Sequence, residues 1–354
     1  MNMDGFIVLD KPQGPTSHQV DYWVKQLLGT DKVGHVGTLD PNVTGVLVMA
    51  VGKATKLIDV AHESPKEYVC VMRFYADISE EKVRDLFHMF TGKIYQLPPV
   101  RSAVARSMRI KEIYDLQMIE KRDRMVLFRV RCESGTYIRT LCTDIGYVAG
   151  TGAQMVDLRR TVTGPFVEDN AITLQELTAA VEIAKTGNDR ILRSFILDVS
   201  YLFRNYPKVI AKKSSIKNIS HGSDLYAGGV KAIIGSFIKG DRVCVLSEDN
   251  DVLGTGKAMC DSANMISKVV DFDRIIVGDQ SGETDVVRNG EKIVPGPGHE
   301  LHRNIQRNES RKNTENFRRR QDSRPERNAH YLRKNKDKGG IHRRSDHHQT
   351  RSFP

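Results

Sequence analysis

A glycine-rich loop at Gly34–Gly45 holds the residues of this chain that are best suited to chemistry. Its sequence is Gly-His-Val-Gly-Thr-Leu-Asp-Pro-Asn-Val-Thr-Gly, and Asp40 is its only carboxylate. Glycines let the backbone approach a ligand closely, and a well-positioned carboxylate can act as a nucleophile. The wholly apolar run 46–51 predicts a buried strand directly after the loop. This pattern is typical of an active-site loop built around one acidic residue.

The same residues also permit a purely structural interpretation. Aspartate is a favoured helix N-cap and proline a favoured first helical residue, so Asp40 and Pro41 could simply begin a helix. Other ligand-binding loops do not match. The loop lacks the Gly-Lys-Ser/Thr end of a P-loop and the Gly-x-Gly-x-x-Gly of a dinucleotide site, and it carries no serine on a strand-to-helix elbow. On these residues alone, Asp40 is either a nucleophile or a helix cap.

The elements around the loop interleave without a regular β-α-β repeat, which favours an α+β domain. Thr16 and Gln19 have the spacing of a capping box, and the helix that they predict should stop at Gly29. Apolar residues alternate with period two over 126–132, as in a half-buried strand. Further strands are predicted at 6–9 and 68–74, and further helices after Ser79, from Tyr137 to about Gly150, and after Thr173.

A second unit is predicted after residue 203. Short strand-like runs separated by Gly-Asp and Asp-Asn turns continue to about residue 280, the pattern of a small β-barrel. From Ser281 the periodicity disappears, and the last segment carries 18 Lys+Arg and 10 Asp+Glu. Such a segment cannot bury enough surface to offset its ordering entropy. We therefore expect domains at 1–203 and 204–280, followed by a disordered basic tail at 281–354.

The overall charge of +10 describes mainly this tail, because the preceding 280 residues carry 36 basic and 34 acidic side chains. The net charge is therefore weak evidence that the folded part binds nucleic acid. The five cysteines have no C-x-x-C spacing and are interpreted as buried free thiols in a reducing compartment. Without a basic leader or an apolar run of about 20 residues, we expect a soluble, cytoplasmic protein.

A basic run follows Pro98 and Pro99. It contains Arg101, Arg106, Arg109 and Lys111 and no acidic residue. Such a run is usually a solvated face, but it could also be a strip that contacts RNA phosphates.

The chain resembles the TruB-type pseudouridine synthases through five motifs that occur in order. These motifs are Leu9–Ser17, Gly34–Gly45, Lys66–Tyr68, Gly135–Leu141 and Leu158–Phe166. Segments 65–69, 98–104 and 126–130 are closer to the archaeal and eukaryotic, dyskerin-like branch, the catalytic subunit of box H/ACA ribonucleoproteins. The second unit, 209–277, is similar to a PUA domain, an RNA-binding β-barrel. The resemblance thus implies a pseudouridine-synthase fold, with a mixed, largely antiparallel sheet, flanking helices and a catalytic cleft, plus a PUA domain.

The resemblance also implies the chemistry. Such an enzyme breaks the C–N glycosidic bond of a uridine in RNA and rejoins the ring through carbon, without a metal or another cofactor. Asp40 would be the nucleophile, and Arg139 would be the cation that keeps it ionised in a dry pocket. The target uridine must be flipped out of the RNA, and Tyr68 would stack on its base.

Four further residues are implied to surround the target. Tyr137 would line the far side of the pocket, Leu158 would pack on the base, His35 would act as a wedge beside the displaced base, and Lys11 would support the loop or touch the RNA backbone. For the tyrosines and Leu158, the alternative is an ordinary core position.

Two functions follow from the resemblance. The first is an RNA pseudouridine synthase that acts in an H/ACA particle, where a guide RNA selects uridines in rRNA. The same enzyme could also modify the T-loop uridine of tRNA without a guide. Its partners would be RNA and the small H/ACA core proteins. The alternative is a non-catalytic RNA-binding scaffold with a PUA module. A lost nucleophile or pocket residue would favour the scaffold, and none of these residues is missing.

Overall fold

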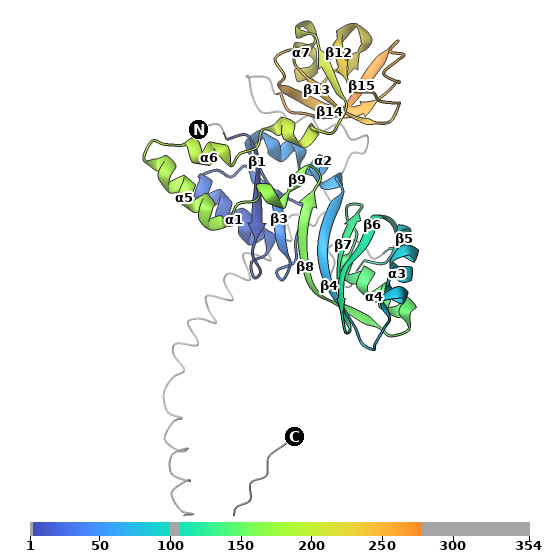
Figure 1. Cartoon of the computed structure of the whole chain (residues 1–354). Coiled ribbons are helices and arrows are strands. Elements are labelled where there is room, and N and C mark those ends of the chain that lie inside the picture. Colours follow the sequence, from blue (N-terminus) through green and yellow to red (C-terminus); the bar gives the residue numbers. More distant parts are fainter. Residues whose placement is uncertain (1–2, 99–106, 278–354) are drawn as a thin grey trace, which may run out of the picture. The chain divides into compact units, whose positions relative to one another are not determined.

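A computed structural model of the chain describes residues 3–98 and 107–277 (Figure 1). Arg101, Arg106 and the tail that we predicted to be disordered lie outside the described residues. The strands before residue 204 are β1 (Gly5–Lys11), β2 (Val33–Val36), β3 (Thr44–Val51), β4 (Lys66–Phe74), β5 (Gly92–Gln96), β6 (Arg109–Arg122), β7 (Met125–Cys132), β8 (Ala153–Thr163) and β9 (Phe166–Val167). The helices are α1 (Ser17–Leu28), α2 (Ile58–Glu63), α3 (Glu80–Met89), α4 (Ile138–Ala149), α5 (Leu174–Lys185) and α6 (Arg190–Ser194).

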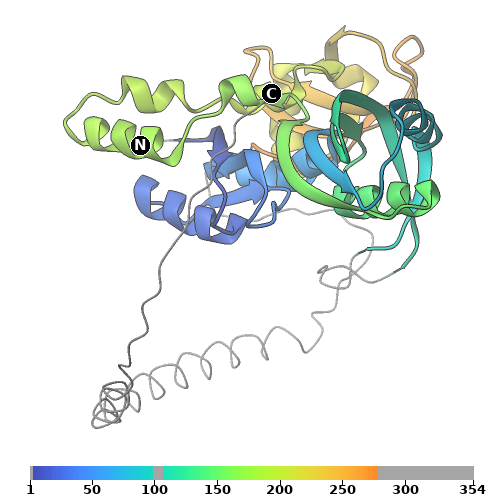
Figure 2. The ribbon, with the colours of Figure 1, turned by 60° about the horizontal axis from the view of Figure 1, so that its bottom comes forward.

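These strands form a nine-stranded sheet in the order β1-β3-β8-β4-β7-β6-β5, with β2 paired to β3 and β9 to β8. The strand β3 is parallel to β8, and the other pairs described in this sheet are antiparallel. This arrangement confirms the predicted mixed, largely antiparallel sheet. Helices α1 and α5 lie at one end of the sheet and α3 and α4 at the other, as Figures 1 and 2 show.

Local signals in the sequence explain several of these elements. Thr16 and Gln19 form the predicted capping box of α1, and Gly29 ends that helix in the left-handed conformation. Thr173 and Glu176 form a second capping box at the start of α5. The apolar residues at alternate positions of β7 are fully buried, as their period predicts.

The strands β1 and β3 are buried on both faces, which explains their continuous apolar sequences. Ile7 and Leu9 of β1 face a core that also contains α1 and α4 residues, whereas Phe6 and Val8 face a second core. The loop Gly34–Gly45 is therefore attached to a strand that is fixed from both sides.

The helix that Asp40 could have capped does not form. Residues Asp40–Val43 make a turn in which the Val43 N–H donates to the Asp40 carbonyl at 3.0 Å, and β3 then begins at Thr44. The capping interpretation is therefore wrong. The sequence allowed this interpretation because proline suits the second position of a turn as well as the first position of a helix.

The second unit forms its own six-stranded sheet, in the order β11-β15-β14-β13-β10-β12. Its elements are β10 (Lys208–Ala211), α7 (Lys213–Ser220), β11 (Leu225–Tyr226), β12 (Val230–Ile234), β13 (Arg242–Leu246), β14 (Val252–Ala258) and β15 (Lys268–Ile275). Val209, Val243 and Val270 belong to a core of this unit. The sequence predicted strands at β10, β12, β13 and β14 but not α7 or β15. Among the helices of the described residues, none is long and apolar enough to span a membrane.

Candidate active site

Asp40 and Arg139 form an ion pair, as the resemblance implied. Arg139 is the second residue of α4, and its Nη2 donates to Asp40 Oδ2 at 2.6 Å. Both side chains are more than half exposed, at 57% for Asp40 and 56% for Arg139. Exposed ion pairs contribute little to stability because water screens them. The pair therefore lies at an open surface rather than in the dry pocket that the resemblance implied, and it contributes little to the stability of the fold.

Lys11 supports the turn that carries Asp40 from beneath. Its side chain is buried, and Nζ donates to the carbonyls of Pro41 at 3.2 Å and Val43 at 2.9 Å. Burial lowers the pKa of Lys11, and the negative charge of Asp40 opposes that shift. Of the two roles that the sequence left open for Lys11, its burial favours support of the loop over contact with RNA.

Arg160 is a second buried cation under the loop, and the sequence analysis did not single it out. Its Nε donates to the carbonyl of Val46 at 2.8 Å and its Nη2 to the carbonyl of Gly37 at 2.9 Å. Burial lowers the pKa of Arg160, although its hydrogen bond to the Tyr68 hydroxyl opposes the shift. A signal was available: residues 158 and 160 share one face of a strand, so Arg160 should point inward with Leu158.

Gly45 lets β8 approach the loop. It pairs with Arg160 across the parallel strands β3 and β8, and its φ is +98°. A Cβ at this position would lie 2.2 Å from the Arg160 carbonyl oxygen, which no side chain could tolerate. A glycine is therefore required where the loop joins β3.

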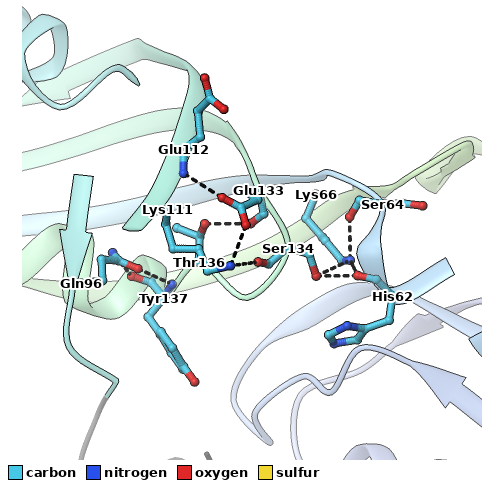
Figure 3. Close-up of polar contacts among 10 residues, drawn as sticks. All are labelled: His62, Ser64, Lys66, Gln96, Lys111, Glu112, Glu133, Ser134, Thr136 and Tyr137. Carbon is cyan, nitrogen blue, oxygen red and sulfur yellow. Dashed lines mark hydrogen bonds and ion pairs between the residues drawn. The ribbon is translucent and has the colours of Figure 1, made fainter. Parts of the chain in front are cut away.

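Lys66 is the third buried cation, and it joins the end of α2 to the turn before α4 (Figure 3). Its Nζ donates to the Ser64 carbonyl at 2.7 Å, to Ser134 Oγ at 3.0 Å and to the His62 carbonyl. Burial lowers the pKa of Lys66 to about 7, and the positive charge of Arg160 adds to that shift.

The turn that leads into α4 is also held from its other side. Lys111 Nζ contacts Glu133 Oε1 at 2.8 Å and donates to the Ser134 carbonyl at 2.7 Å. The Gln96 side chain accepts from the Tyr137 N–H at 2.9 Å and donates to the Tyr137 carbonyl at 3.1 Å (Figure 3). These contacts fix the start of α4, and with it Arg139.

Tyr68 and Leu158 lie on neighbouring strands of one sheet face. In the register of β4 and β8, Tyr68 is opposite Arg160 and Cys70 is opposite Leu158, so Tyr68 and Leu158 are diagonal neighbours. Tyr68 is half-buried and Leu158 is buried. Burial raises the pKa of Tyr68, against the opposing charge of Arg160. Tyr137 is half-buried at the N-cap of α4, one residue before the helix that carries Arg139.

His35 is held at both ring nitrogens. Its Nδ1 lies 2.7 Å from Asp21 Oδ2, and its Nε2 lies 3.0 Å from Thr38 Oγ1. The ring of His18 meets the His35 ring edge-on at 5.1 Å. Within the described residues, the other Asp21 oxygen is buried and has no hydrogen-bond partner. Asp21 lies outside the motifs by which the sequence was analysed, so only the structure reveals it.

The group His18, Asp21 and His35 has ligand types that suit a metal ion, and one ligand atom of each lies within 4.8 Å of the others. However, a tetrahedral zinc site separates its ligand atoms by about 3.3 Å. The 2.7 Å between His35 and Asp21 is the length of a direct hydrogen bond. The geometry therefore favours a hydrogen-bonded chain from Asp21 through His35 to Thr38.

Two residues of the predicted basic strip, Arg109 and Lys111, lie within the described part of the chain. Arg109 is half-buried at the start of β6, and Lys111 pairs with Glu133 as described above. The charge of Lys111 is therefore used within the protein, and RNA contact by either residue stays a prediction.

Comparison with known families agrees with this geometry. Residues 25–138 match the model of the TruB family pseudouridylate synthase N-terminal domain, and residues 139–204 match the tRNA pseudouridylate synthase B C-terminal domain. Residues 207–276 match the PUA domain.

Curated relatives are similar over nearly the whole chain. A probable tRNA pseudouridine synthase B of Thermoplasma volcanium is 64% identical over 346 residues, which cover 98% of this chain and 98% of that protein. A protein of the same name from Methanocaldococcus jannaschii is 45% identical over 276 residues, covering 77% of this chain and 82% of the relative. The chain belongs to the TruB family of pseudouridine synthases.

Solved structures place it nearer one branch of that family. The chain is similar to the protein in the crystal structure of a Cbf5-Nop10-Gar1 complex, with 38% identity and a TM-score of 0.74, covering 78% of this chain and 86% of that one. It is also similar to a chain in the structure of an H/ACA RNP bound to a substrate RNA containing 2′-deoxyuridine, with 36% identity, a TM-score of 0.71 and the same coverage. The predicted resemblance to the dyskerin-like branch is confirmed, and the chain is an RNA pseudouridine synthase, an isomerase.

Proposed function

We propose that this chain is the catalytic subunit of a guide-RNA-directed H/ACA particle that isomerises uridines in rRNA. The observation that carries the proposal is the exposed Asp40–Arg139 pair, whose loop is held in place by the buried Lys11 and Arg160. Such a site presents a fixed carboxylate to an incoming nucleotide. The similarity to chains solved in H/ACA complexes supports the guided mode of action.

In the proposed reaction, Asp40 attacks the target nucleotide, and the bond that it forms breaks again before the product leaves, which restores the free carboxylate. The bond between N1 of uracil and the ribose carbon breaks, and a bond from C5 to the same ribose carbon forms. The C5 proton is lost and N1 gains a proton, so the reaction consumes no other reactant. Arg139 would keep the Asp40 carboxylate aimed at the target nucleotide.

The pocket residues would hold the base while it turns. Tyr68 offers an aromatic face for stacking, and its hydrogen bond to Arg160 would keep the ring in one orientation. Leu158, a diagonal neighbour of Tyr68, would pack against the base, and Tyr137 would close the far side. His35, fixed by Asp21 and Thr38, would occupy the space that the flipped base leaves.

The proposed partners are RNA and the small core proteins of the particle. Similar proteins have been solved in a Cbf5-Nop10-Gar1 complex and in a Nop10-Cbf5 complex, and we propose equivalents of Nop10 and Gar1 for this chain. The PUA domain would bind the guide RNA. Base pairing between guide and substrate selects the sequence, so the protein needs to recognise only the shape and the backbone of the RNA. We further propose that the protein acts in the cytoplasm.

A second activity is favoured by the curated relatives, which are named as probable tRNA pseudouridine synthase B. We propose that the chain also modifies the T-loop uridine of tRNA without a guide. The scaffold alternative would require a degraded site, whereas Asp40, Arg139, Tyr68, Tyr137 and Leu158 are all present.

One assay separates these proposals. The purified chain is incubated with C5-tritiated tRNA transcript, and separately with C5-tritiated rRNA fragment, each with and without guide RNA and the two small partner proteins. Tritium release from rRNA only in the complete mixture supports the guided function. Release from tRNA by the chain alone supports the second activity, and no release under any condition would contradict both.

A further inference from the structure

A pocket of about 600 Å³ extends from Arg139 along the outer side of α4. Arg139, Thr143 and Tyr147 line it at intervals of four residues, so they form one stripe along the helix. Tyr75, which directly follows β4, lies on the opposite wall. We call this pocket the α4 trough. Arg139, which also contacts Asp40, is shared by the trough and the candidate active site.

Two aromatic rings are exposed in the α4 trough. Tyr147 is 85% exposed and Tyr75 is 58% exposed, although rings of this size usually lose most of their surface on folding. Neither ring is needed to cover the cores of the sheet. Exposed aromatic surface beside an active site therefore indicates an interaction surface.

Tyr75 is also fixed in place. Its N–H donates to the Gly152 carbonyl at 3.1 Å, and its hydroxyl donates to Gln154 Oε1 at 3.3 Å. The ring packs so closely on Gly152 that a Cβ there would lie 2.7 Å from the ring carbon Cδ2. A ring that is already ordered loses little entropy when a ligand stacks on it.

The aromatic rings of the α4 trough suit nucleobases. Among the described residues that line it, none is acidic, and its one cation, Arg139, is paired with Asp40. Every nucleobase has a face that can stack on tyrosine, so stacking would supply the affinity. From residue 139 to residue 147, α4 rises about 12 Å, roughly the length of three stacked nucleotides at ~3.4 Å each.

We propose that the α4 trough binds unpaired nucleotides that flank the target uridine in an RNA loop, as in the unguided tRNA reaction proposed above, with Tyr147 and Tyr75 as stacking platforms. The proposal rests on the proposed function, because it takes the nucleotide at Asp40 as its starting point. The trough lengthens the contact between enzyme and RNA without adding to the chemistry. It therefore contributes to the binding of substrate and leaves the isomerisation step to the residues around Asp40.

The test measures stacking directly. RNA oligonucleotides carry the target uridine in an unpaired segment and 2-aminopurine at one of the three positions on either side. With the full-length chain, fluorescence is expected to be quenched at adjacent positions on one side of the target. The quenching should be lost in Tyr147→Ala and Tyr75→Ala and retained in Tyr147→Phe, which keeps the ring. This readout needs no turnover. If the chain bound RNA but released no tritium, the proposed function would be contradicted, and the quenching would still show whether RNA binds in the trough.

Kinetics provide the second readout. Tyr147→Ala should raise the KM for RNA roughly 5- to 100-fold, with kcat changed by no more than about twofold, as expected from the loss of one stacked base. An RNA with abasic residues at the quenched positions should bind the wild type and Tyr147→Ala equally. Tyr95→Ala is the matched control, because Tyr95 is a similarly exposed tyrosine on β5, at the far edge of the sheet.

The opposite results would overturn the proposal. Unchanged quenching and an unchanged KM in both alanine variants would show that RNA does not occupy the trough. If the same variants instead failed to co-elute with one of the small partner proteins, the trough would be a protein interface.

Discussion

Asp40 and Arg139, 99 residues apart in the sequence, meet at 2.6 Å between Oδ2 and Nη2. The loop brings one residue and the first turn of α4 brings the other, and both are exposed. The position of each depends on a separate set of contacts: Lys11 and Arg160 hold the loop, and Gln96, Lys111 and Lys66 hold the start of α4.

Arg139→Lys tests whether the pair orients the carboxylate. Lysine keeps the charge but not the planar guanidinium, so we expect kcat/KM to fall at least about 100-fold, equivalent to about 2.7 kcal/mol. Because the pair is exposed, the free energy of unfolding should change by less than about 1 kcal/mol. Tritium release and urea denaturation measure the two effects. Full activity, or a large loss of stability, would contradict an orienting role.

Asp21→Ala tests the support of His35. Without the Asp21 carboxylate, the His35 ring loses the partner at Nδ1, so both neutral tautomers become populated. We expect activity to fall about tenfold, and less in Asp21→Asn, whose amide oxygen can still accept. Nitrogen NMR of labelled histidine should show an Nδ1-protonated ring in the wild type and a mixture in Asp21→Ala. The same tautomer in both proteins would refute the support by Asp21.

Lys66 makes stability depend on pH in a defined direction. Its folded pKa of about 7 is below the ordinary value of 10.5, so between these values the unfolded chain binds more protons than the folded one. Stability from this group therefore rises with pH across that window, by up to about 1.4 kcal/mol per pH unit, and is lowest below pH 7. Urea denaturation at pH 7 and pH 9 should show the wild type gaining stability relative to Lys66→Met. A difference that does not change with pH would exclude the effect.

Gly45→Ala tests the close approach of β3 and β8. The new Cβ would meet the Arg160 carbonyl at 2.2 Å, so we expect a loss of at least about 3 kcal/mol in the free energy of unfolding. Gly92→Ala is the matched control. Gly92 has a similar φ of +103° and no atom within 4 Å of its Cβ position, so it should cost only about 1–2 kcal/mol of backbone strain. If both variants lost the same free energy of unfolding, backbone strain at positive φ, and not the contact with the Arg160 carbonyl, would explain the need for glycine at position 45.

The elements with local signals were predictable from the sequence. The capping box of α1, the glycine that ends it and the alternation of β7 each depend on residues a few positions apart. The Asp40–Pro41 pair misled because its two residues favour a turn and a helix start equally. The helix α7 was missed because it is short and has two apolar residues, Ile216 and Ile219. The strand β15 did carry a local signal, because Val270 and Phe272 alternate with Asp271 and Asp273, and this signal was overlooked.

The sequence predicted the residues that face the substrate but not the buried residues that hold them in place. Asp40, Arg139 and Tyr68 lie in motifs that a family resemblance can identify. By contrast, Arg160 is buried because distant carbonyl groups accept its hydrogen bonds, for example that of Gly37, 123 residues away. Lys66 likewise needs Ser134 Oγ, 68 residues away, in addition to two nearby carbonyls. Whether such acceptors are in reach depends on the tertiary structure, and no local pattern contains that information.

The central claim is that Asp40 is the nucleophile, and Asp40→Asn tests it most directly. The amide has the same shape but cannot attack, so tritium release from C5-labelled uridine in RNA should fall at least about 1,000-fold. The affinity for the same RNA should stay within about threefold, and the melting temperature should hardly change because the Asp40–Arg139 pair is exposed. Asp31→Asn, on an exposed residue before β2, is the control. Tritium release by Asp40→Asn at a rate close to that of the wild type would contradict the assignment.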